Sequence, residues 1–383
     1  MSGPLEGLLV VELGGFIAGP FAGQLLGDYG ARVMKIESPT GDPLRTWGRQ
    51  HDGVGLWWPS LGRNKESVVL DLHTEAGRRA ALRLCTAADV VVENFAPGRL
   101  TEWGLGWTAL SAANARLVLT HVSGYGQDGP RAPDRGFGSV AEAMGGIRGL
   151  LGYPDRPPSR AGISLGDALA AMFAVIGTLA ALRERDRSGL GQEVDVALYE
   201  AVFALMESTL ADHEIAGFTR GRTGSTLPGI APSNAYPTAD GKDLIIAANA
   251  DPLFRRLAAA MGLPELADDP RFADHQARGA RMAELDGLVS AWTSTRTTAE
   301  LEETLDEAGV PRGRIFDAGD MLADEQYAAR EMVVRVPVDG LQQELPMPGI
   351  VPKLSRTPGS VRHPGPALGE HTTAVAAEFG LDL

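Results

Sequence analysis

The stretch LLVVELGGFIAGPFAGQLLGDYGARVMKIE, residues 8–37, decides the fold. Its first part, 8–13, is apolar and β-prone, 19–30 has helical character and closes on a glycine, and 31–37 is β-prone again. A strand, a helix and a second strand in this order form a βαβ unit, in which the two strands run parallel. The stretch therefore predicts an α/β domain built on a parallel sheet.

The same alternation continues beyond this first unit. β-Prone runs at 67–72, 89–95 and 117–126 are separated by an amphipathic helical stretch at 74–88, and a long apolar helix is predicted from about 169 to 185. Ligands of such sheets bind at the carboxyl ends of the strands. We therefore expect functional side chains in the segments that directly follow the strands.

The length of 383 residues favours two domains over one. A loop rich in Gly, Pro and Ser spans roughly 217–235, and the pattern after it changes to short helices. We predict a large domain from residues 1–216 and 331–383 and a smaller α/β domain with its linkers from 217–330. A final helix is expected to pack back onto the large domain.

Composition excludes several classes of protein. The formal net charge is -14 and no basic stripe is visible, so nucleic acid is not expected as a partner. The single cysteine, Cys85, rules out an intramolecular disulfide and a cysteine-based metal site, and its apolar context predicts a buried free thiol. The apolar run 168–182 is short for a membrane span, and no signal-peptide pattern opens the chain. These features predict a cytoplasmic protein.

Three loops are candidates for ligand binding. GGFIAGPFAG, 14–23, lies where a dinucleotide fingerprint would lie but does not match G-x-G-x-x-G, so an NAD-binding domain has only the acidic end of the second strand in its favour. Close packing around the glycines is the other reading of this loop. In ENFAPGRL, 93–100, Asn94 and Phe95 end a strand and suit a ring such as adenine, although Phe95 could equally be packed. The Gly/Pro loop 124–139 carries Arg131 and Arg135, and arginine is the usual partner of phosphate.

Asp167 is the candidate for covalent chemistry. None of the seven histidines lies in a nucleophile elbow or in a metal spacing such as H-E-x-x-H, and Cys85 has a buried context, so we take a carboxylate as the best remaining nucleophile. In GISLGDALAAMFAVIGTLAA, 162–181, Asp167 precedes the apolar helix. It could cap that helix, react, or do both. A helix N-terminus would keep the carboxylate ionised, and its free N–H groups could hold an oxyanion.

Six motifs in order give the sequence a family resemblance. They are LVVELGGFIAGPFAGQLLGDYGARVMKIE, GRNKESVVLDL, DVVVENFAPG, HVSGYGQDGP, SLGDALAAMFAVIGTLAALRERDRSGLGQEVDVAL and LGEHT. Over nearly the whole chain the sequence resembles the class III CoA-transferases, the family that includes formyl-CoA and carnitine CoA-transferases and α-methylacyl-CoA racemases.

The resemblance implies a fold and an activity. The fold would be a large domain with a parallel, Rossmann-like sheet formed by both chain ends, a smaller α/β domain, and an interlocked homodimer. CoA would move from an acyl-CoA donor to a carboxylic acid acceptor, with Asp167 as nucleophile and with anhydride and aspartyl-CoA intermediates. CoA would be a substrate, with no tightly bound cofactor, no metal and no membrane partner.

The resemblance also implies CoA contacts. These are Asn94 and Phe95 at adenosine, Arg135 at phosphate, Asn64 and Lys65 at the nucleotide, Ile17 and Ala18 near the thioester, and Phe137 beside them. The sequence departs from the family at three places: Ile17 replaces a glutamine of formyl-CoA transferases, Ser38 replaces an arginine, and their glycine-rich loop has its nearest counterpart around Gly229.

Two other functions remain open at this point. A racemase needs a proton-transferring histidine, which by loop spacing would fall at Phe137, and phenylalanine cannot carry a proton. A CoA-binding protein without transferase activity is the other alternative. For the acceptor, the stretch 224–241 is most similar to family members that use dicarboxylates such as succinate, and Arg220 and Arg222 could meet a second carboxylate or simply be solvated.

Overall fold

A computed structural model describes residues 3–383 and divides the chain into two compact units. Unit 1 comprises residues up to Arg148, Ala161–Glu207 and Glu325–Leu383, and unit 2 comprises Gly149–Arg160 and Ser208–Asp324. Relative to the domain bounds expected from the sequence, the segments 149–160 and 208–216 belong to unit 2, and the segment 325–330 belongs to unit 1.

Unit 1 is built on a six-stranded parallel sheet in the order β5-β2-β1-β6-β7-β8. The strands are β1 (Leu9–Leu13), β2 (Arg32–Glu37), β5 (Lys65–Val69), β6 (Val90–Glu93), β7 (Val118–Ser123) and β8 (Glu193–Ala197). The predicted strands are confirmed, with the third displaced two residues toward the N-terminus. Among the described residues, the C-terminal end adds no strand to this sheet, which corrects the expectation that both chain ends form it.

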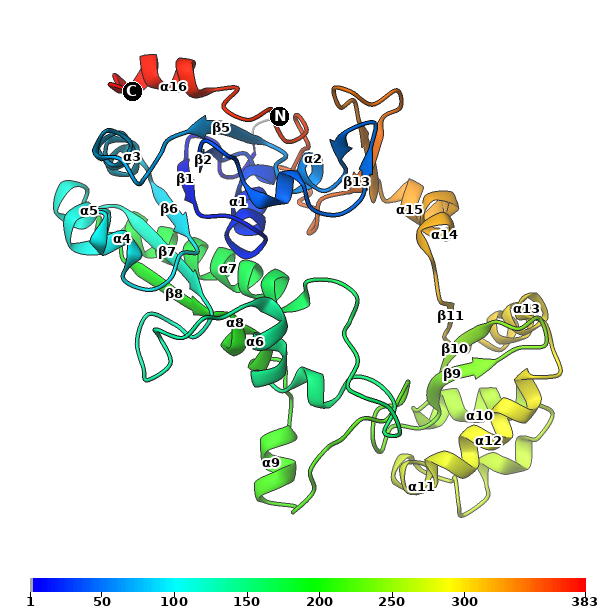
Figure 1. Ribbon diagram of the computed structural model, residues 1–383. Coiled ribbons are helices and arrows are strands. Elements are labelled where there is room, and N and C mark those ends of the chain that lie inside the picture. The colour runs from blue at the N-terminus through cyan, green and yellow to red at the C-terminus, as the bar shows by residue number, and fades with distance from the viewer. Residues whose placement is uncertain (1–2) are drawn as a thin grey trace. The chain divides into compact units, whose positions relative to one another are not determined.

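Helices cover both faces of the sheet (Figure 1). One face packs against α1 (Ala18–Asp28), α6 (Gly138–Met144), α7 (Leu165–Ser188) and α8 (Leu198–Phe203). The other face packs against α3 (Glu75–Ala87), α4 (Arg99–Glu102), α5 (Trp107–Ala113) and the C-terminal α16 (Thr372–Phe379). Cys85 is buried on this second face, as predicted. Sheets covered on both sides have apolar strands throughout, which explains the β-prone runs of the sequence.

The C-terminal segment returns to the edge strand β5. The His371 N–H donates to the Ser67 carbonyl at 3.0 Å, and the Val69 N–H donates to the Thr372 hydroxyl at 3.0 Å. This arrangement confirms that the final helix packs on the large domain. The remaining elements of unit 1 are β3 (Gln50–His51), β4 (Val54–Gly55), α2 (Trp58–Leu61), α15 (Glu325–Ala329), β12 (Val333–Val336) and β13 (Leu345–Pro348).

Helix α7 is long and apolar enough to span a membrane by length and composition alone. Its buried residues, including Ala170, Ala171 and Ala174, belong to the core of unit 1, and Thr178 bonds Thr120 of β7 at 2.7 Å. These contacts identify α7 as a core helix. Its opposite side exposes apolar side chains, among them Met172, Phe173, Ile176 and Leu179.

Unit 2 has a separate core. An antiparallel sheet of order β11-β10-β9 packs with helices around Tyr236, Phe254 and Leu285. Its elements are α9 (Thr209–Glu214), β9 (Ser233–Pro237), β10 (Asp243–Ala247), α10 (Asp251–Ala260), α11 (His275–Ala280), α12 (Met282–Thr293), α13 (Thr298–Ala308), β11 (Arg312–Arg314) and α14 (Ala318–Ala323).

Candidate functional site

The strand order of unit 1 reverses direction between β1 and β6. At such a switch point the connections leave toward opposite faces and open a crevice, which is where ligands of open α/β sheets bind. The segment after β1 and the segment after β6 therefore frame the candidate site.

Asn94 joins these two segments. Its Oδ1 accepts the Gly15 N–H at 3.0 Å, and its Nδ2 donates to the Gly15 carbonyl at 2.7 Å. A Cβ on Gly14 would lie 2.0 Å from Asn94 Oδ1, and one on Gly19 would lie 3.1 Å from the same amide. The glycines of the first loop thus admit the Asn94 side chain, which supports the packing reading of that loop. Phe95, next to it, is half-buried, with its ring 5.1 Å from that of Trp103.

Phe16 is the residue of the first loop that faces outward. It has φ 65°, its ring is partly exposed, and it packs against Trp47 and Phe137 with centroid distances of 5.2 and 5.6 Å. Ile17 instead turns inward against Leu44 and Trp58. Sequence reasoning therefore missed Phe16 and Trp47. The available signal was an aromatic residue placed directly after two glycines, in a loop that follows a strand.

Asp167 lies in the first turn of α7. The helix begins at Leu165 with Ser164 at the N-cap position, so Asp167 is not the cap, and the capping explanation is corrected. Its carboxylate lies against Gly138, where an added Cβ would come 2.0 Å from Asp167 Oδ2. Gly138 begins α6 directly after Phe137, whose ring contacts Phe16. The rings of Phe16, Trp47 and Phe137 form an aromatic wall at the first loop. The half-buried Asp167 carboxylate lies beside this wall, against the glycine that follows Phe137.

The loop after β7 returns to the same edge of the sheet. Gly124 and Gly136 approach so closely that a Cβ on Gly124 would lie 2.5 Å from Gly136 Cα. Between them the chain carries exposed Arg131 and Arg135. Arg135 is two residues from Phe137, so this loop places an exposed cation close in the sequence to Phe137.

Two predicted nucleotide contacts lie in the interior. Lys65 is fully buried, with Nζ 2.7 Å from Glu12 Oε2 and 2.6 Å from the Pro20 carbonyl. Asn64 is 2% exposed, and its amide binds Asp28 Oδ1 at 2.8 Å. Both side chains are occupied in holding unit 1 together, so the expectation that they contact a nucleotide is corrected.

Buried charges lie beneath the site on both faces of the sheet. For Glu12, burial would raise the pKa, but the charges of Lys35 and Lys65 outweigh it, so its pKa lies below the ordinary value. His121 on β7 lies 2.5 Å from Glu93 and 3.2 Å from Glu193. Burial would lower the pKa of His121, yet the Glu93 hydrogen bond outweighs it and raises that pKa. The imidazole is therefore engaged on both nitrogens below the surface.

The two arginines considered for a second carboxylate are occupied within unit 2. Arg220 pairs with Asp212 at 2.6 Å, and Arg222 donates to the carbonyls of Tyr153 and Arg156. Both side chains stabilise their own loops. Among residues 3–383, no cluster of three or more His, Cys, Asp or Glu side chains has the arrangement of a metal site.

Known proteins similar to this chain share one family. The model of CoA-transferase family III matches residues 5–372. Succinyl-CoA–D-citramalate CoA-transferase of Chloroflexus aurantiacus is 54% identical over 98% of this chain and 94% of its own length. Succinate–glutarate CoA-transferase of Agrobacterium fabrum is 36% identical over 98% and 96%. A crystal structure of a CaiB/BaiF family protein from Brucella suis superposes with a TM-score of 0.86 at 36% identity, covering 99% of this chain and 100% of that one.

Proposed function

This chain belongs to CoA-transferase family III, and from that premise we propose that it transfers CoA from succinyl-CoA to a small dicarboxylic acid through a covalent intermediate on Asp167. One observation carries the proposal: the Asp167 carboxylate lies at the edge of the sheet, on Gly138 and beside the aromatic wall of the first loop. The choice of succinyl-CoA and a dicarboxylate is supported by the 54% and 36% identical relatives.

The chemistry needs one carboxylate and no proton transfer. An oxygen of Asp167 attacks the thioester carbonyl of succinyl-CoA, the C–S bond breaks, and CoA leaves as the thiolate, which gives a succinyl-aspartyl anhydride. The thiolate attacks the aspartyl carbonyl of this anhydride and releases succinate, leaving CoA as a thioester on Asp167. The acceptor carboxylate then attacks that thioester, the thiolate leaves again, and it takes the new acyl group from the second anhydride. Each step exchanges one acyl bond for another, as in nucleophilic catalysis generally.

The surroundings of Asp167 support acyl transfer over racemisation. A racemase requires a proton-transferring group opposite the carboxylate. The loop position at which a racemase would need its histidine is Phe137, which directly precedes the Gly138 that contacts the Asp167 carboxylate, and phenylalanine does not titrate. In D2O, a 2-methylacyl-CoA substrate should therefore gain no deuterium at its α-carbon, whereas incorporation at the rate of turnover would favour a racemase.

For the nucleotide, the proposal assigns Arg135 to a CoA phosphate, and Asn94 and Phe95 to the edge of the adenosine site. Asn94 would contribute to the adenosine site indirectly, by holding the first loop in place, because both polar atoms of its amide bind Gly15. Phe137, Ala18 and the backbone at Ile17 would lie near the thioester. Arg135→Ala should raise KM for acyl-CoA with little change in kcat, because a phosphate contact is made equally in the ground and transition states.

The proposal includes a homodimer acting in the cytoplasm. The outer side of α7 exposes Met172, Phe173, Ile176 and Leu179, and a second copy of the chain would cover this apolar surface. A cytoplasmic site of action fits a CoA thioester substrate and a single unpaired cysteine. Sedimentation equilibrium should give the mass of two chains, and a monomeric active enzyme would contradict this part.

The direct test of the substrate class is an acceptor screen. Purified enzyme is incubated with succinyl-CoA and one acid at a time, including citramalate, malate, glutarate, mesaconate, oxalate and acetate, and new CoA thioesters are identified by mass spectrometry. Asp167→Asn is the matched control for uncatalysed exchange. Transfer to dicarboxylates supports the proposal, and transfer only to monocarboxylic acids would contradict the substrate class.

A further inference from the structure

Two charged side chains that the proposed chemistry does not use hold the backbone of the first loop. Lys35 Nζ of β2 donates to the Gly14 carbonyl at 3.2 Å. Asp42 Oδ1 accepts the Phe16 N–H at 3.2 Å. The loop is thus bound at both ends of its turn by a cation and an anion that come from the segment after α1.

These two charges form a buried ion pair. Lys35 Nζ and Asp42 Oδ2 are 2.8 Å apart, with side chains 0% and 1% exposed. Burial alone would lower the pKa of Lys35, but the charges of Glu12 and Asp42 outweigh it and raise that pKa, so the ammonium keeps its charge. A buried ion pair costs desolvation and is stable only where its geometry is well satisfied.

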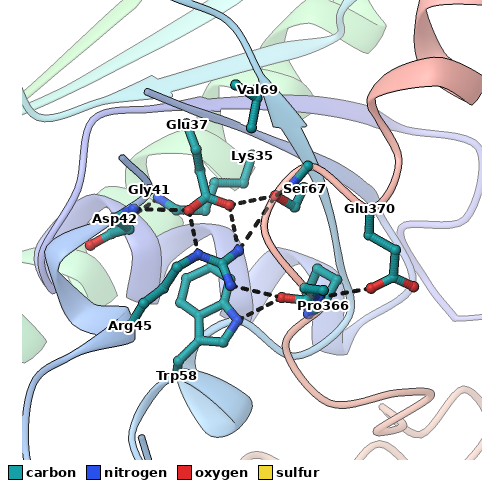
Figure 2. A network of polar contacts seen from close by, with 12 residues as sticks. Lys35, Glu37, Gly41, Asp42, Arg45, Trp58, Ser67, Val69, Pro366 and Glu370 are labelled. Atoms are coloured by element: carbon teal, nitrogen blue, oxygen red, sulfur yellow. Dashed lines mark hydrogen bonds and ion pairs between the residues drawn. The ribbon is translucent and has the colours of Figure 1, made fainter. Parts of the chain in front are cut away.

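Asp42 is itself fixed in place from two directions (Figure 2). Its own N–H donates to Glu37 Oε2 at 2.9 Å, and Glu37 is held by Arg45 at 2.7 Å. Its side chain also accepts the Leu44 N–H at 2.9 Å, which caps the short 3₁₀ turn Pro43–Arg45. The carboxylate that binds Phe16 therefore has little freedom to move.

The conformation of Phe16 requires such an anchor. At φ 65° it occupies the left-handed region, which is unfavourable for a non-glycine residue and persists only where its surroundings enforce it. In this conformation the Phe16 ring contacts Phe137. Phe137 directly precedes Gly138, the glycine against which the Asp167 carboxylate lies. A change in the Phe16 backbone would consequently move the wall beside the reacting group.

We propose that Asp42, oriented by Lys35, is a positioning residue that holds Phe16 in the left-handed conformation and so fixes the wall of the crevice beside Asp167. Its effect on catalysis rests on the proposed function, whereas its effect on the loop does not. Losing this placement should lower kcat more than it raises KM, because the nucleotide contacts are left in place while the reacting groups lose their alignment.

Asp42→Ala and Asp42→Asn are the informative variants, and Asp89→Asn is the matched control. Like Asp42, Asp89 accepts a backbone N–H and pairs with a basic side chain, but it lies at the other end of the sheet. It accepts the Leu9 N–H at 2.9 Å and pairs with Arg185 at 2.9 Å. We expect Asp42→Ala to lower kcat about 10²-fold, the size of effect that follows a small misplacement of reacting groups. Asp42→Asn, which keeps an acceptor oxygen, should have a smaller effect and carries the test if the alanine variant does not fold. Asp89→Asn should leave kcat unchanged.

A double-mutant cycle with Phe16→Gly separates positioning from general destabilisation. Glycine adopts the left-handed conformation without help, so the Asp42 substitutions should change kcat much less in the Phe16→Gly background than in the wild type. Equal fold-losses in the two backgrounds would overturn the proposal.

Hydrogen exchange tests the loop independently of any activity. The Phe16 amide should exchange faster in both Asp42 variants than in the wild type, and Asp89→Asn should not change it. Unaltered exchange at Phe16 in the Asp42 variants would overturn the positioning role, whether or not the wild type transfers CoA. Absence of transfer by the wild type, with faster exchange in the variants, would overturn the proposed function and the catalytic effect while leaving the loop anchor supported.

Discussion

The carboxylate of Asp167 lies directly on Gly138, so closely that a methyl group on the Gly138 Cα would come 2.0 Å from Asp167 Oδ2. No side chain other than hydrogen fits at position 138 without moving the carboxylate or the start of α6. This contact joins the helix that carries the proposed nucleophile to the loop that follows β7.

Gly138→Ala should therefore impair catalysis. The added methyl group displaces the carboxylate, and a displacement of this kind lowers kcat/KM by about 10²-fold. The matched control is Gly287→Ala in α12, where an added Cβ meets no atom within 4 Å. That substitution should leave kcat/KM unchanged and raise the free energy of unfolding by up to about 1 kcal/mol. Normal turnover in Gly138→Ala would show that the close contact has no catalytic consequence.

Glu37 should make stability depend on pH in the acid range. Burial would raise its pKa, but the hydrogen bond from Arg45 and the charge of Lys35 outweigh it, so the pKa of Glu37 lies below its ordinary 4.5. A carboxyl whose pKa is lowered in the folded state contributes stability that is present above the unfolded value and is lost as pH falls through the folded value.

Urea unfolding of the wild type should accordingly show a free energy of unfolding that declines as pH drops below about 4.5, the ordinary pKa. Glu37→Gln should flatten this decline and destabilise the protein at pH 7 by about 3 kcal/mol, since it leaves the Arg45 guanidinium without its charged partner. An unchanged pH slope in the variant would show that other carboxyl groups carry the effect.

Cys85 should be unreactive while the protein is folded. Burial raises the pKa of its thiol to about 12, so almost no thiolate exists at neutral pH. An aromatic disulfide reagent should release no chromophore from native protein at pH 7 and one equivalent per chain in 6 M guanidinium chloride. Rapid labelling of the native protein would contradict the burial of this side chain.

The parallel sheet could be predicted because its strands are apolar on both faces and separated by helix-length segments, as in Val90–Glu93 between α3 and α4. The six ordered motifs predicted the protein family and its activity, and they singled out Asp167 as the candidate nucleophile. The apolar pattern predicts a start for α7 four residues later than the structure shows, because its first turn, Leu165–Ala168, follows a loop and mixes glycine with a charge. That error made Asp167 look like a cap.

Residues 64 and 65 show what the sequence could not reveal. Asn64 and Lys65 lie next to Arg63 in a polar run that is typical of an exposed turn. All three side chains are nevertheless buried, because they bind partners far away in the sequence: Asp28 for Arg63 and Asn64, and Glu12 for Lys65. Nothing local to GRNKES encodes these partners. The same holds for Phe16, whose left-handed backbone depends on Asp42, 26 positions away.

The most direct test of the account is a search for the covalent intermediate. Tryptic peptide 161–183, AGISLGDALAAMFAVIGTLAALR, carries a single side-chain carboxyl group, that of Asp167. Enzyme incubated with succinyl-CoA and no acceptor, then treated with hydroxylamine and digested, should yield this peptide with a hydroxamate at Asp167. The adduct should be missing without succinyl-CoA and in Asp167→Asn. A hydroxamate on another peptide, or an unmodified 161–183 peptide from enzyme that still transfers CoA, would contradict the assignment of Asp167 as the nucleophile.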